Sequence, residues 1–174
     1  NGITWRRRRN SDDPVRTALG VGPLGSGVSD NPDLLRGLAE HADDPDFRKR
    51  YAAMRRVRKR KLARVISERT GIAVDPAALF DVQIKRIHEY KRQLLNLLHT
   101  VALYQAMRND PGTQWAPRVK IFSGKAAASY HQAKLIIKLT NDIARVVNND
   151  PTVPGLLKVV FLPNYNVSLA ESII

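Results

Sequence analysis

The chain has 174 residues, a length typical of one domain or of one part of a larger one. Its composition is 43% hydrophobic and 26% charged, which excludes an intrinsically disordered chain, and its net charge is +13. The absence of cysteine excludes disulfides, thiolate metal sites and a cysteine nucleophile. No apolar run approaches the roughly 18 residues that span a bilayer and no signal-peptide pattern opens the chain, so we expect a cytoplasmic protein.

The positive charge gathers in two places, an arginine run at residues 6–9 and a longer cluster at residues 48–64. The longer cluster contains no acidic residue, and such density is typical of surfaces that bind nucleic acid or another polyanion. The alternative is the solvated face of a packed helix. Apolar residues at helical spacing favour this alternative: Phe47, Tyr51, Met54, Val57, Leu62 and Val65.

The first half of the chain is predicted to be loop followed by helices. Residues 5–29 combine arginines, Ser-Asp-Asp-Pro and four glycines, and we expect a loop there. A short helix is predicted over residues 33–41. Acidic residues and proline at residues 43–46 then provide the capping chemistry of a second, basic helix, which should run to about Thr70 and stop at Gly71.

The second half alternates between strands and helices. Strands are predicted at residues 79–84, 119–122 and 157–162, with helices at 88–108 and 130–147 and another beginning at Val167. This alternation predicts an α/β fold with a parallel βαβαβ sheet. The first helix should bury the face that carries Leu94, Leu95, Leu98, Val101 and Ala102, and the second should bury Ala133, Ile136, Ile137, Thr140, Ile143 and Ala144.

Cations follow the first two predicted strands, where parallel sheets bind their ligands. Lys85, Arg86 and Lys91 follow the first strand, and Lys125 follows the second. Helix N-termini beside these cations favour an anion, and the guanidinium fork of Arg86 suits phosphate. The alternative is that these side chains only face solvent, and the spacing leaves both interpretations open.

Other catalytic patterns are missing from the sequence. The four histidines, which are His41, His88, His99 and His131, lack the spacing of metal ligands, and we expect no metal site. His99 lies within an apolar helix pattern and is expected to be a core histidine. No glycine-rich nucleotide loop and no nucleophile elbow follows any predicted strand, which argues against dinucleotide and nucleoside triphosphate binding.

The segment FDVQIKRIHEYKRQLLN at residues 80–96 closely resembles the signature of the glycogen, starch and maltodextrin α-glucan phosphorylases. Asn-Gly-Ile-Thr at residues 1–4 and the stretches at 124–131, 146–151 and 164–171 resemble the same family in the same order. The resemblance implies part of the C-terminal lobe of a GT-B glycosyltransferase fold. We therefore expect an irregular segment at residues 1–30, a helical segment at 31–79 and an incomplete Rossmann-like lobe at 80–174.

The family transfers the terminal glucose of an α-1,4-glucan to inorganic phosphate, with pyridoxal 5'-phosphate (PLP) acting through its own phosphate group. The resemblance implies that Arg86 binds the substrate phosphate, that Lys91 lies near both phosphates and that Lys85 supports the cofactor phosphate. Tyr90 and Asn1 correspond to residues at the sugar site. Three residues match the turn that contacts PLP, namely Tyr165, Asn166 and Val167. The implied partners are the glucan, phosphate, an N-terminal lobe and a second subunit.

Two features depart from the family pattern. The chain stops before the glycine-rich segment and the lysine that binds PLP, and it lacks the N-terminal lobe, so we expect an internal piece of a longer enzyme that is inactive alone. Residues 5–27 also lose the family pattern at nearly unchanged length. Our hypothesis is that this interval is a frame-shifted translation, and translating it in the other two frames would test this.

Overall fold

The structure of the chain is a computed structural model that describes residues 32–173. The predictions for residues 1–29, which include Asn1, the arginine run and the frame-shift hypothesis, lie outside the described residues. The chain divides into two compact units, the first ending at Val57 and the second beginning at Arg58. The domain limits expected from the sequence stay a prediction.

In the first unit, the expected short helix is a 3-10 helix, η2 (Pro32–His41), and the basic helix α3 (Pro45–Thr70) begins four residues later. The predicted capping is confirmed, because the Asp44 carboxylate accepts hydrogen bonds from the main-chain N–H groups of Asp46 at 2.9 Å and Phe47 at 3.3 Å. Such bonds satisfy donors that the first helical turn leaves free. In the second unit, α3 ends at Thr70 and is followed by Gly71, whose φ of +71° suits glycine just after a helix end, as predicted.

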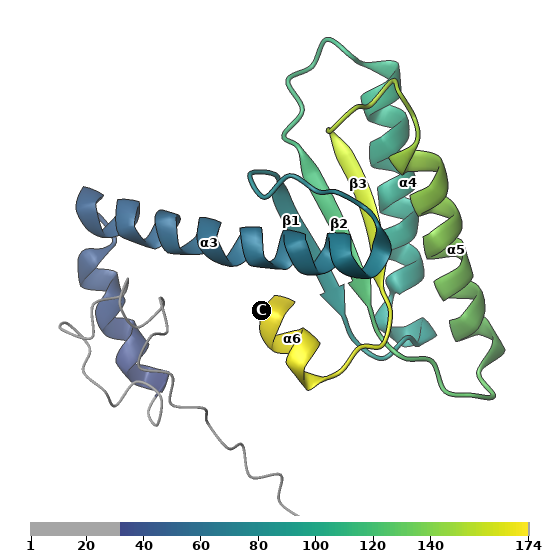
Figure 1. Cartoon of the computed structure of the whole chain (residues 1–174), viewed down its shortest axis with the longest axis horizontal. Coiled ribbons are helices and arrows are strands. Elements are labelled where there is room, and N and C mark those ends of the chain that lie inside the picture. Colours follow the sequence, from purple (N-terminus) through teal and green to yellow (C-terminus); the bar gives the residue numbers. More distant parts are fainter. Residues whose placement is uncertain (1–31, 174) are drawn as a thin grey trace, which may run out of the picture. The chain divides into compact units, whose positions relative to one another are not determined.

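The second unit is built on the predicted parallel sheet (Figure 1). Its strands are β1 (Leu79–Ile84), β2 (Arg118–Ser123) and β3 (Leu157–Leu162), and they lie in the order β1-β2-β3. Two helices connect them, α4 (Gln93–Asn109) and α5 (His131–Asn148), and α6 (Val167–Ile173) follows β3. The α/β class and the parallel βαβαβ order are therefore confirmed.

Helices cover both faces of this sheet. On one face, α4 and α5 pack against β2 and β3 through Leu97, Tyr104, Met107, Phe122, Ala133, Ile136, Ala144, Leu157 and Val159. On the other face, the end of α3 and the short α6 pack against the sheet through Leu62, Ile66, Val119, Ile121, Val160, Leu162, Leu169 and Ile173. Burial on both faces explains why β3 is a nearly continuous apolar run, whereas β2 carries Arg118, Lys120 and Ser123 beside its apolar residues.

The helix expected over residues 88–108 starts later and faces the other way. Glu89–Lys91 form a separate 3-10 turn, η3, and Arg92 has a φ of +60°, so α4 begins only at Gln93. Its buried residues are Gln93, Leu97, Thr100, Tyr104 and Met107, whereas Leu94, Leu95 and Leu98 are 45–58% exposed. The predicted apolar face was wrong because the buried face contains polar side chains that find hydrogen-bond partners inside the fold.

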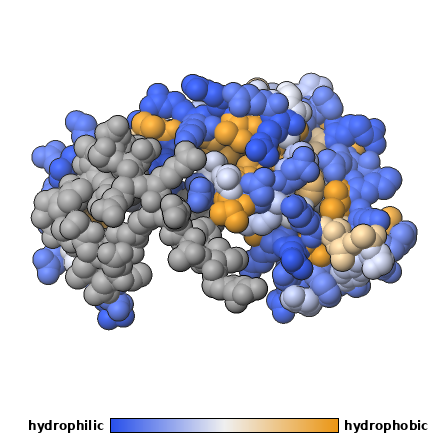
Figure 2. All heavy atoms as spheres, turned by 60° about the horizontal axis from the view of Figure 1, so that its bottom comes forward, coloured by the Kyte–Doolittle hydropathy of each residue, from blue (hydrophilic) through white to orange (hydrophobic). Residues whose placement is uncertain are grey.

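The surface of the described residues is mostly hydrophilic, with small apolar islands on the face shown in Figure 2. Within residues 32–173, no helix combines the length and the hydropathy that crossing a membrane requires.

Candidate functional site

The carboxyl ends of the three strands meet at one edge of the sheet. Ile84, Ser123 and Leu162 are register partners across β1, β2 and β3. The pairing continues past the strands, because the main-chain N–H groups of Lys85 and Ile87 donate to the carbonyl oxygens of Ser123 and Lys125, both at 3.1 Å. The three segments that the sequence places at strand ends are therefore neighbours at this edge.

Gly124 permits the close approach of the first two segments. It is buried, and a Cβ atom built on it would lie 2.0 Å from the carbonyl oxygen of Lys85 and 2.9 Å from Cδ1 of Ile87. Any side chain at this position would push the main chain of Lys85 away. The glycine therefore fixes where the cationic segment leaves the sheet.

We use the name cationic loop for residues 85–92, which connect β1 to α4. The side chains of Lys85 and Arg86 are exposed, and that of Lys91 is half-buried. The loop closes on itself through hydrogen bonds from the Lys91 N–H to the His88 carbonyl at 3.0 Å and from the Arg92 N–H to the Glu89 carbonyl at 3.1 Å. The three cations to which the resemblance gives a phosphate role thus all belong to the cationic loop at the sheet edge.

Two glutamines that the sequence analysis missed hold this loop. Gln83 donates from Nε2 to the Lys91 carbonyl at 3.0 Å. Gln93, only 1% exposed, donates to the Arg86 carbonyl at 3.2 Å and accepts from the His88 N–H at 3.4 Å. The sequence did contain a signal for these contacts, because a glutamine stands on each side of the loop in a segment that is mostly apolar. A buried amide needs hydrogen-bond partners, and the nearby main chain of the loop can supply them.

Tyr90 belongs to an aromatic group on the same loop. Its ring is 70% exposed, its centroid lies 4.2 Å from that of His88, and the Lys91 ammonium lies 5.4 Å from its centroid. The ring of Tyr130 also lies against His88, with 4.9 Å between the ring centroids. The Tyr130 hydroxyl donates to the Glu89 carboxylate, which raises the pKa of Tyr130 and ties the loop to the start of α5.

The third strand end forms the turn that leads into α6. Asn164 adopts a φ of +57°, and Asn166 caps α6 by accepting from the Leu169 N–H at 2.9 Å. Tyr165 is half-buried and packs against the same apolar cluster as Ile84, the last residue of β1. The turn containing Tyr165, Asn166 and Val167 therefore shares the sheet edge with the start of the cationic loop.

The basic helix buries its apolar side. Leu62 and Ile66 lie in the core of the second unit, and the N–H₃⁺ group of Lys59 donates to the Ala78 carbonyl at 2.5 Å. Phe47 and Met54 are also buried, whereas Tyr51 and Val57 are 44% and 45% exposed. This arrangement agrees with the solvated face of a packed helix.

The histidines form no metal centre: no three His, Asp or Glu side chains in the part of the chain that the structure describes could hold an ion together. The expectation that His99 is a core residue was wrong. Its side chain is exposed, and its Nδ1 lies 3.2 Å from the ammonium of Lys120. The apolar pattern around His99 belongs to the outer side of α4.

Comparison with known proteins agrees with the motif at the sheet edge. The chain matches the model of the carbohydrate phosphorylases over residues 1–174. It is 48% identical to glycogen phosphorylase of Pasteurella multocida and 42% identical to the human liver form, in each case over the whole of this chain. It spans 21% and 20% of the length of these two relatives. The chain therefore belongs to the carbohydrate phosphorylase family.

Proposed function

We propose that the chain forms the phosphate-binding part of an α-glucan phosphorylase, a glycosyltransferase-type enzyme of the GT-B fold. The complete enzyme would transfer terminal α-1,4-linked glucose to inorganic phosphate and release α-glucose 1-phosphate. The observation that carries this proposal is the position of three cations in one turn, at the sheet edge where the strand ends meet. Nothing in the comparisons favours the alternative, a polyanion-binding module built on α3.

In our proposal, the three cations offset the repulsion between the two phosphate groups that this reaction brings together. Two phosphate groups side by side repel each other strongly unless positive charges lie around them. In our proposal, Arg86 binds the substrate phosphate through its guanidinium fork, and Lys91 lies near both phosphates. Lys85 supports the cofactor phosphate. The same cations would stabilise the charge that shifts as phosphate attacks an oxocarbenium-like carbon.

The residues at this edge fit PLP by the chemistry of their donor groups. Lys85 and Lys91 offer ammonium groups for a phosphate, and Tyr165 offers an aromatic ring and a hydroxyl from the turn after β3. Asn166 and Val167 complete the proposed PLP-contacting turn. When bound, PLP would supply a phosphate group beside the substrate phosphate. We propose that the lysine that attaches PLP covalently comes from outside these 174 residues, as does the N-terminal lobe, and that the chain alone has no phosphorylase activity.

The sugar site is proposed to include Tyr90, whose exposed ring stands next to Lys91. Asn1, which lies outside the described residues, is proposed to hydrogen-bond the transferred glucose. The remaining partners follow the family. We propose a cytoplasmic homodimer that acts on α-glucan and phosphate and does not bind nucleic acid.

A hybrid enzyme tests this function. Residues 32–173 replace the matching residues of the Pasteurella multocida enzyme, so that the departing segment at residues 5–27 is left out, and phosphorolysis of glycogen is measured as glucose 1-phosphate released at varied phosphate concentration. We expect an active hybrid in which Arg86→Ala lowers kcat/KM for phosphate by roughly 100-fold or more, the loss typical of removing one charge-stabilising donor.

The matched control is Arg145→Ala, because this arginine is 74% exposed on α5. It should leave kcat/KM for phosphate unchanged. A folded hybrid without phosphorolysis, or an Arg86→Ala hybrid with the parent's phosphate dependence, would overturn the proposal.

A further inference from the structure

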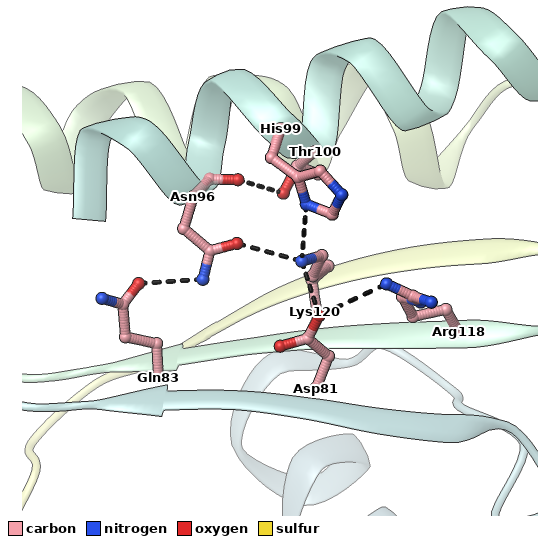
Figure 3. Close-up of polar contacts among 7 residues, drawn as sticks. All are labelled: Asp81, Gln83, Asn96, His99, Thr100, Arg118 and Lys120. Carbon is pink, nitrogen blue, oxygen red and sulfur yellow. Dashed lines mark hydrogen bonds and ion pairs between the residues drawn. The ribbon is translucent and has the colours of Figure 1, made fainter. Parts of the chain in front are cut away.

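A polar network lies between α4 and the sheet, and a buried lysine is at its centre (Figure 3). Lys120, in the central strand β2, is only 2% exposed. Its Nζ atom lies 2.6 Å from the Asp81 carboxylate, 3.0 Å from Asn96 Oδ1 and 3.2 Å from His99 Nδ1. Each of the three ammonium hydrogens therefore has one acceptor.

This ammonium group decides how the neighbouring amides are oriented. A lysine ammonium can only donate hydrogen bonds, so Asn96 must present its oxygen to Lys120 and its NH₂ group to the opposite side. There Asn96 Nδ2 donates to Gln83 Oε1 at 2.9 Å. Because the oxygen of Gln83 faces Asn96, its own NH₂ group must point away from Asn96.

The NH₂ group of Gln83 reaches the cationic loop, where it donates a hydrogen bond to the carbonyl oxygen of Lys91 at 3.0 Å. We propose that Lys120, acting through Asn96 and Gln83, is a positioning residue that holds Lys91 in place. This inference rests on the proposed function for the role of Lys91, and it assigns the positioning to residues that lie outside the cationic loop.

The hydrogen bond from Gln83 fixes the peptide group between Lys91 and Arg92. Lys91 is followed by Arg92 in the left-handed conformation, so the main chain turns sharply directly after the Lys91 carbonyl. Holding that carbonyl fixes the direction in which the Lys91 side chain leaves the main chain. Hydrogen bonds in such a chain polarise one another, and the charge on Lys120 makes the first of them a charge-assisted bond.

Asn96→Asp tests the relay, because it keeps the shape of the side chain while it replaces the NH₂ donor by an acceptor oxygen. It also adds a negative charge beside Lys120, and the matched control therefore carries the same exchange of amide for carboxylate. The new carboxylate would accept from Lys120 and from the NH₂ group of Gln83. Gln83 would then turn its oxygen toward the Lys91 carbonyl, and the hydrogen bond to the loop would be lost. We expect amide hydrogen exchange at Lys91 and Arg92 to become about fivefold faster, as the loss of one hydrogen bond allows.

Binding of inorganic phosphate to the full chain is the second measurement, by ³¹P NMR titration. We expect the Kd in Asn96→Asp to rise about fivefold for the same reason. The matched control is Asn148→Asp, since the Asn148 amide also donates a hydrogen bond, to the Val159 carbonyl at 2.8 Å, but Asn148 lies at the end of α5. This control should leave the Lys91 amide and the phosphate Kd unchanged.

A double-mutant cycle separates a relay from two independent contacts. Gln83→Met removes the donor to Lys91, so Asn96→Asp should add nothing to it if both residues act in sequence. Additive effects of the two substitutions would overturn the relay, and so would unchanged exchange at Lys91 in Asn96→Asp or equal loosening in the Asn148→Asp control. If exchange responds as expected but the parent chain binds no phosphate, the relay stands and the proposed phosphate site is wrong.

Discussion

Gly124 and Lys85 come so close at the sheet edge that a single added methyl group would collide with the main chain. The Cβ of an alanine at position 124 would lie 2.0 Å from the Lys85 carbonyl oxygen. A backbone oxygen cannot move aside as the end of a flexible side chain can. The exit of the cationic loop from β1 therefore depends on a glycine in the neighbouring strand end.

We expect Gly124→Ala to lower the free energy of unfolding by about 2 kcal/mol, the usual cost of forcing an extra carbon into a packed site. Urea denaturation measures this loss. Gly112→Ala is the control, because the nearest atom to its Cβ is the Asp110 carboxylate oxygen at 3.8 Å. Equal stability of the two variants would show that the strand ends separate without cost.

Asp81 is the charge that compensates buried Lys120. Their ion pair measures 2.6 Å, with Lys120 2% exposed and Asp81 31% exposed. Asp81→Ala should therefore lower the free energy of unfolding by about 3 kcal/mol, the lower end for removing one partner of a buried pair. Thermal and urea denaturation of the full chain provide the measurement.

The double variant Asp81→Asn with Lys120→Met separates the loss of the pair from the cost of an uncompensated charge. It removes both charges and keeps side chains of similar size. Replacing both partners of a buried pair is often nearly neutral, so this variant should recover most of the stability lost in Asp81→Ala. A double variant as unstable as Asp81→Ala would show that Lys120 stabilises the fold through the ion pair together with its contacts to Asn96 and His99.

Strand positions could be predicted from the sequence because local chemistry determines them. The strands at residues 79–84 and 157–162 have the predicted limits, and the central strand extends the predicted 119–122 by one residue at each end. These segments are rich in Val, Ile, Leu and Phe, and proline or glycine flanks most of their ends. The meeting of the three strand ends then follows from parallel order alone.

The start of α4 could not be predicted in the same way. Residues 88–92 contain no proline or glycine that would end a helix, but Gln93 bonds to the main chain of Arg86 and His88 and holds those residues outside the helix. Hydrophobic periodicity does not register such contacts between side chain and main chain. The glutamines that hold the candidate site were missed for the same reason.

Two neighbouring leucines on α4 differ in burial, and this difference tests the orientation of the helix. Leu97 is fully buried, whereas Leu98 is 58% exposed. We expect Leu97→Ala to cost about 3 kcal/mol of unfolding free energy because it leaves a cavity. Leu98→Ala should change it by less than about 0.5 kcal/mol. Urea denaturation compares the two variants, and a larger loss in Leu98→Ala than in Leu97→Ala would mean that the sequence-based orientation of α4 was correct.

Acid stability should depend on Asp150. Its carboxylate accepts hydrogen bonds from the Tyr104 hydroxyl and from the side chain and main chain of Thr152, and Arg108 lies 3.3 Å away. These contacts, led by that of Tyr104, hold the pKa of Asp150 at about 2, below its ordinary value of 3.8. A carboxyl group whose pKa is lowered by folding stabilises the fold above its unfolded pKa and loses that contribution as pH falls toward the folded value.

We therefore expect the contribution of Asp150 to be complete above about pH 4 and to disappear as pH falls to about 2. Urea midpoints measured between pH 6 and pH 2 should fall less steeply in Asp150→Asn than in the parent chain, so that the two converge in acid. Tyr104→Phe removes the largest cause of the shift and should give an intermediate slope. Parallel pH curves for the parent and Asp150→Asn would contradict this prediction, because they would show that the Asp150 proton is not linked to folding.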